Sequence, residues 1–362
     1  MQPVMVVVGT RPEIIKMAPI VRALKRYHIP FLLVHCGQHY DYNMSQQFIE
    51  NLELPSPNFS FKIRTSSPVE QTARIIIQMN KLLKRILPSV VLVEGDTNTV
   101  LAAAIAANKR GAPVGHVEAG LRSFDLRMPE EHNRRLTDHI SNFLFAPTTR
   151  SETNLKKENV WGKIYVTGNT VIDAVIQHLP IAERKSTILE KILFKKFALA
   201  TAHRAENVDD QDVLKNFIGV LEDSPIPVVY SMHPRTRKRL RQNKLLSRIE
   251  KSENVQLFPP LGYLDFLILM KKCELIITDS GGIQEEATSP NIRKPVLVMR
   301  LSTERPEAVE SGFAKVIGTD KDKTLTAINN ALGKWEQLPD KSPYGNGDAA
   351  EKIVKIIQQE IS

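Results

Sequence analysis

The chain has 362 residues, 42% of them hydrophobic and 25% charged, which is a globular composition but too long for one comfortable core, so we expect two domains. The net charge of +9 attracts anions, yet aromatic residues make up only 6% and zinc-finger spacings are absent, which argues against nucleic acid. Two cysteines make no disulfide framework, and no stretch reaches the roughly 20 apolar residues of a membrane helix, so we expect a cytoplasmic protein without a membrane partner.

The first part of the chain alternates apolar strands with amphipathic helices. Strands are expected at Val4–Gly9, Phe31–Gly37, Ser89–Glu94, Ala112–Val117, Asn142–Pro147 and Lys163–Asn169, and helices at Glu13–Tyr27, Gln71–Ile86 and Thr99–Arg110. The strands are apolar throughout rather than alternating, so both of their faces should be buried. That pattern predicts a parallel sheet between two layers of helices.

The pattern restarts after residue 169. Strands are expected at Phe197–Arg204, Pro227–Pro234, Asn254–Leu261, Glu274–Gly282, Pro295–Arg300 and Ala314–Asp320. We therefore predict two Rossmann-like α/β domains, residues 1–169 and 170–362. The last amphipathic helix, over 348–361, has packing back on the N-terminal domain as one option, and its pattern leaves the partner domain open. Ligands of such sheets bind beyond the carboxyl ends of the strands, which makes the cleft between the domains the expected site.

Acidic residues follow the strands of the first domain. Asp96 ends VLVEGD, Glu118 ends VGHVE, and Glu130 lies in RMPEEHNR. Asp96 and Glu118 are one helix and one strand apart, so adjacent strands would bring both to one edge of the sheet. Each has a structural alternative: a helix N-cap for Asp96, an ion pair with Arg122 for Glu118, and a helix N-terminus for Glu130. Together they indicate a site where carboxylates remove a proton or stabilise a developing positive charge.

Two motifs are typical of anion binding. In GTRPEIIK, Gly9 permits a tight turn, Arg11 offers a fork of donors, and Lys16 adds a charge one turn later. In TDSGGIQEEA, small residues let backbone N–H groups approach a phosphate; the candidates are Ser280, Gly281 and Gly282, with Glu286 for the ribose hydroxyls. A plain helix start is the alternative for both motifs.

Three further residues are weaker candidates. His203 in ATAHRAEN ends a strand of the second domain and could protonate or stabilise a departing phosphate. Arg305 in STERPEA is a candidate for a phosphate contact, and Phe266 in LGYLDF for a base contact. No His pair has the spacing of a zinc helix and no GxGxxG follows the first strand, so neither a metal nor a nicotinamide cofactor is expected.

Taken together, the motifs resemble those of the non-hydrolysing UDP-N-acetylglucosamine 2-epimerases. They are GTRPEIIK, GQHYD, EGDTNT, GHVEAGLRSFDLRMPEEHNR, FAPT, VTGNTVIDA, TAHRAEN, TDSGGIQEEA, KPVLVMR, TERPEA and PYGNGDAAEKI. The resemblance implies a glycosyltransferase-B-like fold with UDP bound mainly by the second domain. It also implies anti elimination of UDP from UDP-N-acetylglucosamine to a 2-acetamidoglucal, readdition to give UDP-N-acetylmannosamine, no cofactor, and a homodimer.

By motif position, the resemblance makes Asp96, Glu118, Glu130 and His203 the catalytic set. It places Arg11, Lys16, Arg122, Phe266, Ser280, Gly281, Gly282, Glu286 and Arg305 at the substrate, and it leaves open which carboxylate takes the C2 proton. The chain departs from the bacterial pattern at Ala205, where HRRE reads HRAE, and at Tyr40 and Asp41. These changes lie near the region where some bacterial members bind an activating second substrate molecule, for which Gln38 and His39 are candidates.

Three alternatives stay open. A hydrolysing relative would release N-acetylmannosamine and UDP, a glycosyltransferase would need an acceptor, and a non-catalytic sensor would only bind the nucleotide sugar.

Overall fold

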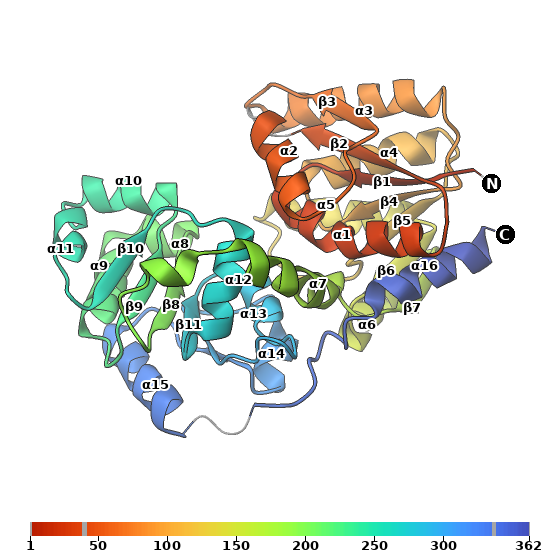
Figure 1. The fold of residues 1–362 in the computed structure, drawn as a ribbon. Coiled ribbons are helices and arrows are strands. Elements are labelled where there is room, and N and C mark those ends of the chain that lie inside the picture. Colours follow the sequence, from red (N-terminus) through yellow and green to blue (C-terminus); the bar gives the residue numbers. More distant parts are fainter. Residues whose placement is uncertain (1, 38–41, 335–337, 362) are drawn as a thin grey trace. The chain divides into compact units, whose positions relative to one another are not determined.

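The computed structural model describes residues 2–37, 42–334 and 338–361. The chain divides into two compact units, which we call unit 1 (Met1–Ala174 with Tyr344–Ser362) and unit 2 (Val175–Pro343) (Figure 1).

In its described residues, unit 1 contains a seven-stranded sheet of order β3-β2-β1-β4-β5-β6-β7, and every pair is parallel. The strands are β1 (Val4–Val8), β2 (Phe31–Gly37), β3 (Phe59–Lys62), β4 (Val90–Glu94), β5 (Val114–Val117), β6 (Phe143–Ala146) and β7 (Lys163–Val166). The prediction of a buried parallel sheet is confirmed. It missed β3, because this four-residue edge strand alternates and is only partly buried.

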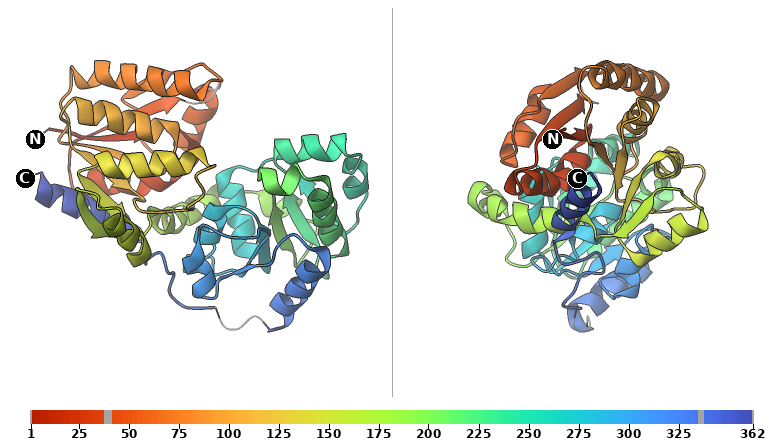
Figure 2. Two further views of the ribbon diagram at one scale, coloured as in Figure 1. Left: turned by 180° about the vertical axis from the view of Figure 1, so that it is seen from behind. Right: turned by 90° about the vertical axis from the view of Figure 1, so that its right-hand side faces the viewer.

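Helices cover both faces of this sheet (Figure 2). They are α1 (Arg11–Arg26), α2 (Tyr42–Asn51), α3 (Pro68–Leu83), α4 (Asn98–Lys109), α5 (Pro129–Ile140), α6 (Thr149–Lys157) and α16 (Ala349–Glu360). Helix α7 (Thr170–Lys185) begins in unit 1 and continues into unit 2. Helix α4 lies between α3 and α5, and its small alanines Ala102, Ala103 and Ala104 are fully buried in the core. Small side chains let this helix approach the sheet and its neighbours closely.

The last helix belongs to unit 1, although unit 2 separates it from the rest of that unit in sequence. Helix α16 packs against α1 (Figure 1). Its first turn is held by Asp173 of α7, whose carboxylate accepts from the backbone N–H groups of Ala350 (2.9 Å) and Ala349 (3.3 Å). Burial raises the pKa of Asp173 to about 6.

Unit 2 repeats the plan with a six-stranded parallel sheet of order β10-β9-β8-β11-β12-β13 within the described residues. The strands are β8 (Ala198–Thr201), β9 (Val228–Ser231), β10 (Val255–Phe258), β11 (Leu275–Thr278), β12 (Val296–Val298) and β13 (Ala314–Val316). The helical segments are η1 (Ile188–Lys191), α8 (Ala205–Val208), α9 (Gln211–Asp223), α10 (Pro234–Gln242), α11 (Leu246–Glu250), α12 (Tyr263–Lys272), α13 (Gly281–Glu286), α14 (Pro306–Glu310) and α15 (Lys321–Lys334).

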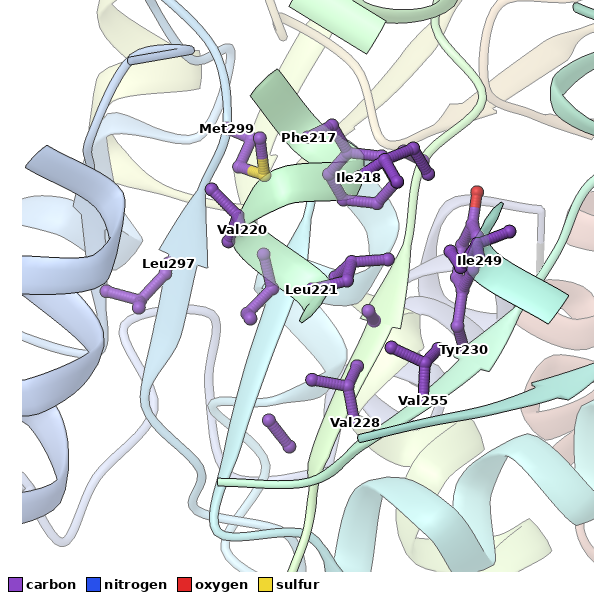
Figure 3. Close-up of a cluster of buried hydrophobic side chains, with 14 of the residues drawn as sticks. Phe217, Ile218, Val220, Leu221, Val228, Tyr230, Ile249, Val255, Leu297 and Met299 are labelled. Atoms are coloured by element: carbon purple, nitrogen blue, oxygen red, sulfur yellow. The ribbon is translucent and has the colours of Figure 1, made fainter. Parts of the chain in front are cut away.

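The core of unit 2 forms where α9 covers the sheet (Figure 3). Phe217 of α9 meets Tyr230 of β9 edge to face, with ring centroids 5.5 Å apart. Ile218 and Leu221 of the same helix are fully buried. Burial of each such side chain contributes roughly 1.5–3 kcal/mol to the free energy of unfolding.

Each sheet has one place where the direction of winding reverses. In unit 1 the chain moves from β1 outward to β2 and β3, then returns to β4 on the other side of β1. In unit 2 the same reversal lies between β8 and β11. This is the strand order of a Rossmann-like fold, so that prediction is confirmed, and the crevices at β1/β4 and β8/β11 are where such sheets bind ligands.

Candidate active site

In unit 1, two loops meet at the reversal point, one after β1 and one after β4. Glu13, in the first turn of α1, joins them: its carboxylate accepts from Gly9 N (2.6 Å) and from the hydroxyls of Thr10 and Thr97 (both 2.8 Å). Full burial raises the pKa of Glu13 to about 7, and these hydrogen bonds oppose the shift. Glu13 therefore fixes the loops and is not itself offered to a ligand.

Gly9 is required by packing. A Cβ atom at this position would lie 2.3 Å from Thr99 Oγ1 at the start of α4. The glycine thus lets the loop after β1 pass directly beside α4.

Glu118 follows β5 and lies in the left-handed backbone region, with φ of 69°. A non-glycine residue is rarely held there, and such strain is concentrated at functional sites. Its nearly buried side chain forms an ion pair with Lys16 of α1 and accepts from Asn169 Nδ2 at 3.3 Å. The structure therefore joins Glu118 to Lys16, and not to Arg122 as the structural alternative proposed.

Glu94, the last residue of β4, shares the same lysine. Its Oε1 lies 3.1 Å from Lys16 Nζ, and its side chain is 2% exposed. Burial raises the pKa of Glu94 well above its ordinary value, and the charges of Glu118 and Glu13 add to the rise while Lys16 opposes it. Glu94 is not among the residues predicted from the sequence, although a charged side chain at the end of a strand buried on both faces is a recognisable signal.

Asp96 stands just past Glu94 and is more accessible, with its side chain 32% exposed. Its carboxylate forms an ion pair with Arg134 of α5. Arg134 also donates to Glu131 Oε2 at 3.1 Å, and Glu131 accepts from Ser123 N at 2.9 Å. Asp96 is thus held by one arginine while keeping access to solvent, as a group that acts on a ligand requires.

Of the two adjacent glutamates at the start of α5, Glu130 is exposed and Glu131 is fully buried. Glu130 was the predicted site residue, and its side chain is on the accessible side of the helix. Glu131 instead belongs to the internal network with Arg134 and Ser123.

Arg122 pairs with acids inside unit 1. Its guanidinium is fully buried and is shared between Asp138 (2.7 Å) and Glu158 (2.7 Å), so in this structure it serves an internal network, and its placement at the substrate stays a prediction. Asp138 also contacts His116 Nδ1 at 2.6 Å, and His116 Nε2 lies 2.8 Å from the carbonyl oxygen of Gly95. Through the contact of His116 with Gly95, this network holds the loop that carries Asp96 in place.

The predicted anion contact Arg11 is exposed, and its guanidinium carbon lies 5.6 Å from the centroid of the Phe48 ring. This cation–π contact aligns the guanidinium and leaves its edge accessible. Gln38 and His39, the candidates for a second-ligand site, lie outside the described residues.

In unit 2, His203 and Asp279 meet at the reversal point between β8 and β11. Asp279 Oδ1 is 3.1 Å from His203 Nδ1, and Asp279 Oδ2 accepts from the backbone N–H groups of His203 and Arg204, both at 2.9 Å. Burial opposes ionisation of Asp279, but the hydrogen bond and charge of His203 outweigh it and lower the pKa of this carboxyl. The imidazole, 40% exposed, therefore presents Nε2 outward.

A second imidazole accompanies this pair. The ring of His233, which follows β9, lies 5.7 Å from that of His203, centroid to centroid. Burial, together with the positive charges of His203 and Arg235, lowers the pKa of His233. The lowered pKa favours the neutral form of His233.

The glycine-rich turn follows β11. Ser280 precedes α13, but its side chain does not cap that helix, so the structural alternative for Ser280 is not realised. A Cβ at Gly281 would lie 3.7 Å from the Arg305 guanidinium, and Arg305 Nε is 2.6 Å from Glu285 Oε1. A salt bridge thus aligns the arginine beside the turn, and Gly282 has open space where its side chain would be.

Glu286 and Phe266 complete this edge, and both are half-buried. The charge of Glu286 lies close enough to Tyr263 of α12 to add to the effect of burial, and the pKa of that phenol is well above its ordinary value. Both predicted residues belong to unit 2, as do His203, Ser280 and Arg305.

In the described part of the chain, groups of three or more His, Cys, Asp or Glu side chains arranged to hold a metal ion do not occur. Nor does any described helix combine the length and apolarity that crossing a membrane demands.

Known proteins resemble this chain over almost its whole length. A model of the UDP-N-acetylglucosamine 2-epimerase family matches residues 22–358. A UDP-N-acetylglucosamine 2-epimerase from Methanocaldococcus jannaschii is 45% identical over 361 residues, covering 97% of this chain and 98% of the relative. The crystal structure of the UDP-GlcNAc 2-epimerase from that organism, in complex with UDP-GlcNAc and UDP, matches with a TM-score of 0.88 at 44% identity, covering 99% of this chain and 100% of that one. A UDP-2,3-diacetamido-2,3-dideoxy-D-glucuronate 2-epimerase from Pseudomonas aeruginosa is 37% identical, covering 98% of this chain and 99% of the relative.

Proposed function

The chain belongs to the UDP-N-acetylglucosamine 2-epimerase family, and from this premise we propose that it interconverts UDP-N-acetylglucosamine and UDP-N-acetylmannosamine. The enzyme is an isomerase of the non-hydrolysing type in this proposal. It requires no cofactor, since the leaving group is already a stabilised diphosphate and the sugar atoms exchange only a proton.

The reaction proceeds by anti elimination and readdition. The C2–H bond breaks and its proton passes to a carboxylate of unit 1, while the C1–O bond breaks and UDP leaves with the bonding pair. The 2-acetamidoglucal then takes a proton at C2 on the opposite face, and UDP returns to C1. Carboxylates favour this path because they accept the proton and stabilise positive charge that develops on the ring.

Unit 1 supplies the groups for the sugar. Asp96, Glu118 and Glu130 are the catalytic carboxylates in this proposal. Glu13 and the network of Arg122, Asp138 and His116 hold the loop that carries Asp96, and Glu130 lies in the first turn of α5. Lys16 is oriented by two of the acids around it and supplies positive charge beside them.

Unit 2 supplies the groups for UDP. Its diphosphate binds at Ser280, Gly282 and Arg305, its ribose at Glu286, and its base near Phe266. His203, oriented by Asp279, stabilises or protonates the departing diphosphate. The fold that holds the two units is glycosyltransferase-B-like.

The observation that carries the proposal is the contrast between the two reversal points. Carboxylates gather at the one in unit 1, whereas a histidine, a glycine-rich turn and an aligned arginine gather at the one in unit 2. A sugar nucleotide has one part for each set of groups. Its sugar ring carries a weakly acidic C2–H for the carboxylates, and its diphosphate carries negative charge for the histidine, the turn and the arginine. We further propose a homodimer that acts in the cytoplasm, where free cysteines such as the buried Cys36 and Cys273 stay reduced, with neither nucleic acid nor membrane as a partner.

The proposal is tested by incubating the protein with UDP-N-acetylglucosamine in heavy water and following the anomeric and C2 proton signals by NMR. Reversible appearance of the manno epimer with deuterium at C2 is expected. Free N-acetylmannosamine would instead identify a hydrolysing enzyme, and an unchanged sugar nucleotide that reacts only with an added acceptor would identify a glycosyltransferase. UDP-2,3-diacetamido-2,3-dideoxy-D-glucuronate serves as the comparison substrate and should turn over more slowly.

A further inference from the structure

Glu94 is a buried acid at the catalytic edge of unit 1 for which the proposed reaction has no role. It ends β4, lies 2% exposed, and contacts the ammonium group of Lys16 at 3.1 Å. The same ammonium is paired with Glu118, which reaches it from the loop after β5. One lysine therefore stands between two carboxyl groups.

The electrostatic surroundings make full ionisation of both acids unfavourable. From α1, Glu13 adds negative charge near Glu94 and Lys16 adds positive charge. From the loop after β5, Glu118 adds negative charge, and from β5 itself His116 faces the neighbouring Gly95 carbonyl. Two carboxylates with one ammonium carry a net charge of −1 in a site shielded from water, whereas one carboxylate with one ammonium is neutral.

The two acids differ in what else they contact. Glu118 accepts from Asn169 Nδ2 at 3.3 Å in addition to its pairing with Lys16, which favours its ionised form. Glu94, which is 2% exposed, also contacts Lys16, but burial and the neighbouring charges of Glu118 and Glu13 favour its protonated form. The proton of such a pair is therefore held by Glu94.

We infer that Glu94 and Glu118 form a carboxyl pair that shares one proton across Lys16, and that Glu94 carries this proton in the resting enzyme. Glu94 is a positioning residue: it keeps Glu118 ionised and the cluster neutral. This inference rests on the proposed function for its catalytic consequence. An additional negative charge here would repel the incoming diphosphate sugar, so loss of the shared proton at high pH should lower kcat/KM.

Glu94→Gln tests the inference, because glutamine has the shape of a protonated glutamate and cannot ionise. We expect the variant to keep kcat/KM at pH 7 within about threefold of the wild type, and the alkaline fall of kcat/KM to move upward by about one pH unit or more. The matched control is Glu70→Gln, which removes one carboxylate from an exposed ion pair with Arg74 and should leave the pH profile unchanged. A profile identical to that of the wild type, or a loss of more than about tenfold at pH 7 with the alkaline limb unmoved, would overturn the inference.

A second measurement needs no activity. With glutamate labelled with ¹³C at the side-chain carboxyl, the wild type without substrate should show a carboxyl that remains protonated at pH 7 and is absent from Glu94→Gln. Glu13→Gln identifies the separate signal of Glu13, and Lys16→Met should raise the midpoint at which the shared proton is lost. If every glutamate except Glu13 is ionised at pH 7, the inference fails even where epimerase activity is present. If that protonated carboxyl is found but no epimer forms, the proposed function fails and the proton pair stands.

Discussion

Asp279→Asn separates the role of the aspartate from that of the histidine it contacts. The wild-type side chain is fully buried, with Oδ1 3.1 Å from His203 Nδ1. Its other oxygen accepts three hydrogen bonds, from the N–H groups of His203 and Arg204 and from Asn207 Nδ2 at 3.1 Å. An asparagine has only one acceptor oxygen, and those three donors will claim it.

The amide NH₂ group must then face His203 Nδ1. A donor at that position forces Nδ1 to accept, so the imidazole proton moves to Nε2, the nitrogen that the wild type presents outward. With no acceptor left for a proton on Nδ1, the imidazolium form that can protonate the departing diphosphate is disfavoured. Loss of general acid–base catalysis typically costs about 10²–10⁴-fold in turnover, which corresponds to roughly 3–5 kcal/mol of transition-state stabilisation. The loss of a charged acceptor should also lower the free energy of unfolding by about 1.5–3 kcal/mol.

The assay is kcat for epimer formation by NMR, with UDP affinity by calorimetry and stability by urea denaturation. UDP affinity should stay within about threefold of the wild type, because the change acts through His203 and not through the glycine-rich turn. His203→Ala provides the control: Asp279→Asn should cost little further activity when added to it. Equal losses in both backgrounds, or a kcat within about threefold of the wild type, would refute the orientation of His203 by Asp279.

Three further variants test other parts of the site. Asp96→Asn should lower kcat by about 10²–10³-fold and leave UDP affinity nearly unchanged, since its charge acts in the transition state; a loss confined to affinity contradicts that role. Glu286→Ala should weaken UDP binding by about tenfold in calorimetry through loss of the ribose contact, and unchanged affinity removes Glu286 from that role. For Glu13, the pKa of about 7 in the folded state exceeds the ordinary 4.5, so the folded protein holds a proton that the unfolded chain releases. Its contribution to the free energy of unfolding is present below pH 4.5 and falls by about 3 kcal/mol as the pH rises through 7. Glu13→Gln should flatten that decline in urea denaturation between pH 5 and pH 8. An equally steep decline in the variant would show that another group causes it.

The sheets were predictable because their strands are apolar at every position. In β4, all five residues from Val90 to Glu94 are buried, and only strands covered on both faces carry such runs. Strand β3 escaped prediction because this short edge strand alternates and is only partly buried, so it lacks the continuous apolar run of the other strands. Strand order follows from the pairing of β1 with both β2 and β4, which no single segment encodes.

The ends of the predicted strands indicate which residues are candidates for the site. They do not indicate which side chains form ion pairs or hydrogen bonds with one another. The spacing of Glu118 and Arg122 suggested a mutual ion pair, yet the backbone at Glu118 is left-handed and directs its carboxylate to Lys16, 102 residues away in sequence. Arg122 finds Asp138 and Glu158 instead. Long-range partners of this kind depend on the fold, so sequence reasoning also passed over Asp279, whose only local signal is an acid at the end of an apolar strand.

The charged groups of both reversal points are stabilised in the same way, by partners within their own unit. Lys16 is paired with acids in unit 1, Asp96 with Arg134, and Asp279 with His203 in unit 2. Desolvating an isolated charge costs several kcal/mol, whereas a paired and hydrogen-bonded group recovers most of that cost. Each unit can therefore hold its reactive groups ready before a ligand arrives, and the binding energy of UDP need not be spent on ordering them. For the same reason, truncation of one partner to alanine adds the cost of the unpaired charge left behind to the measured effect. The neutral replacements Glu94→Gln and Asp279→Asn keep the shape of the side chain, so they are more informative.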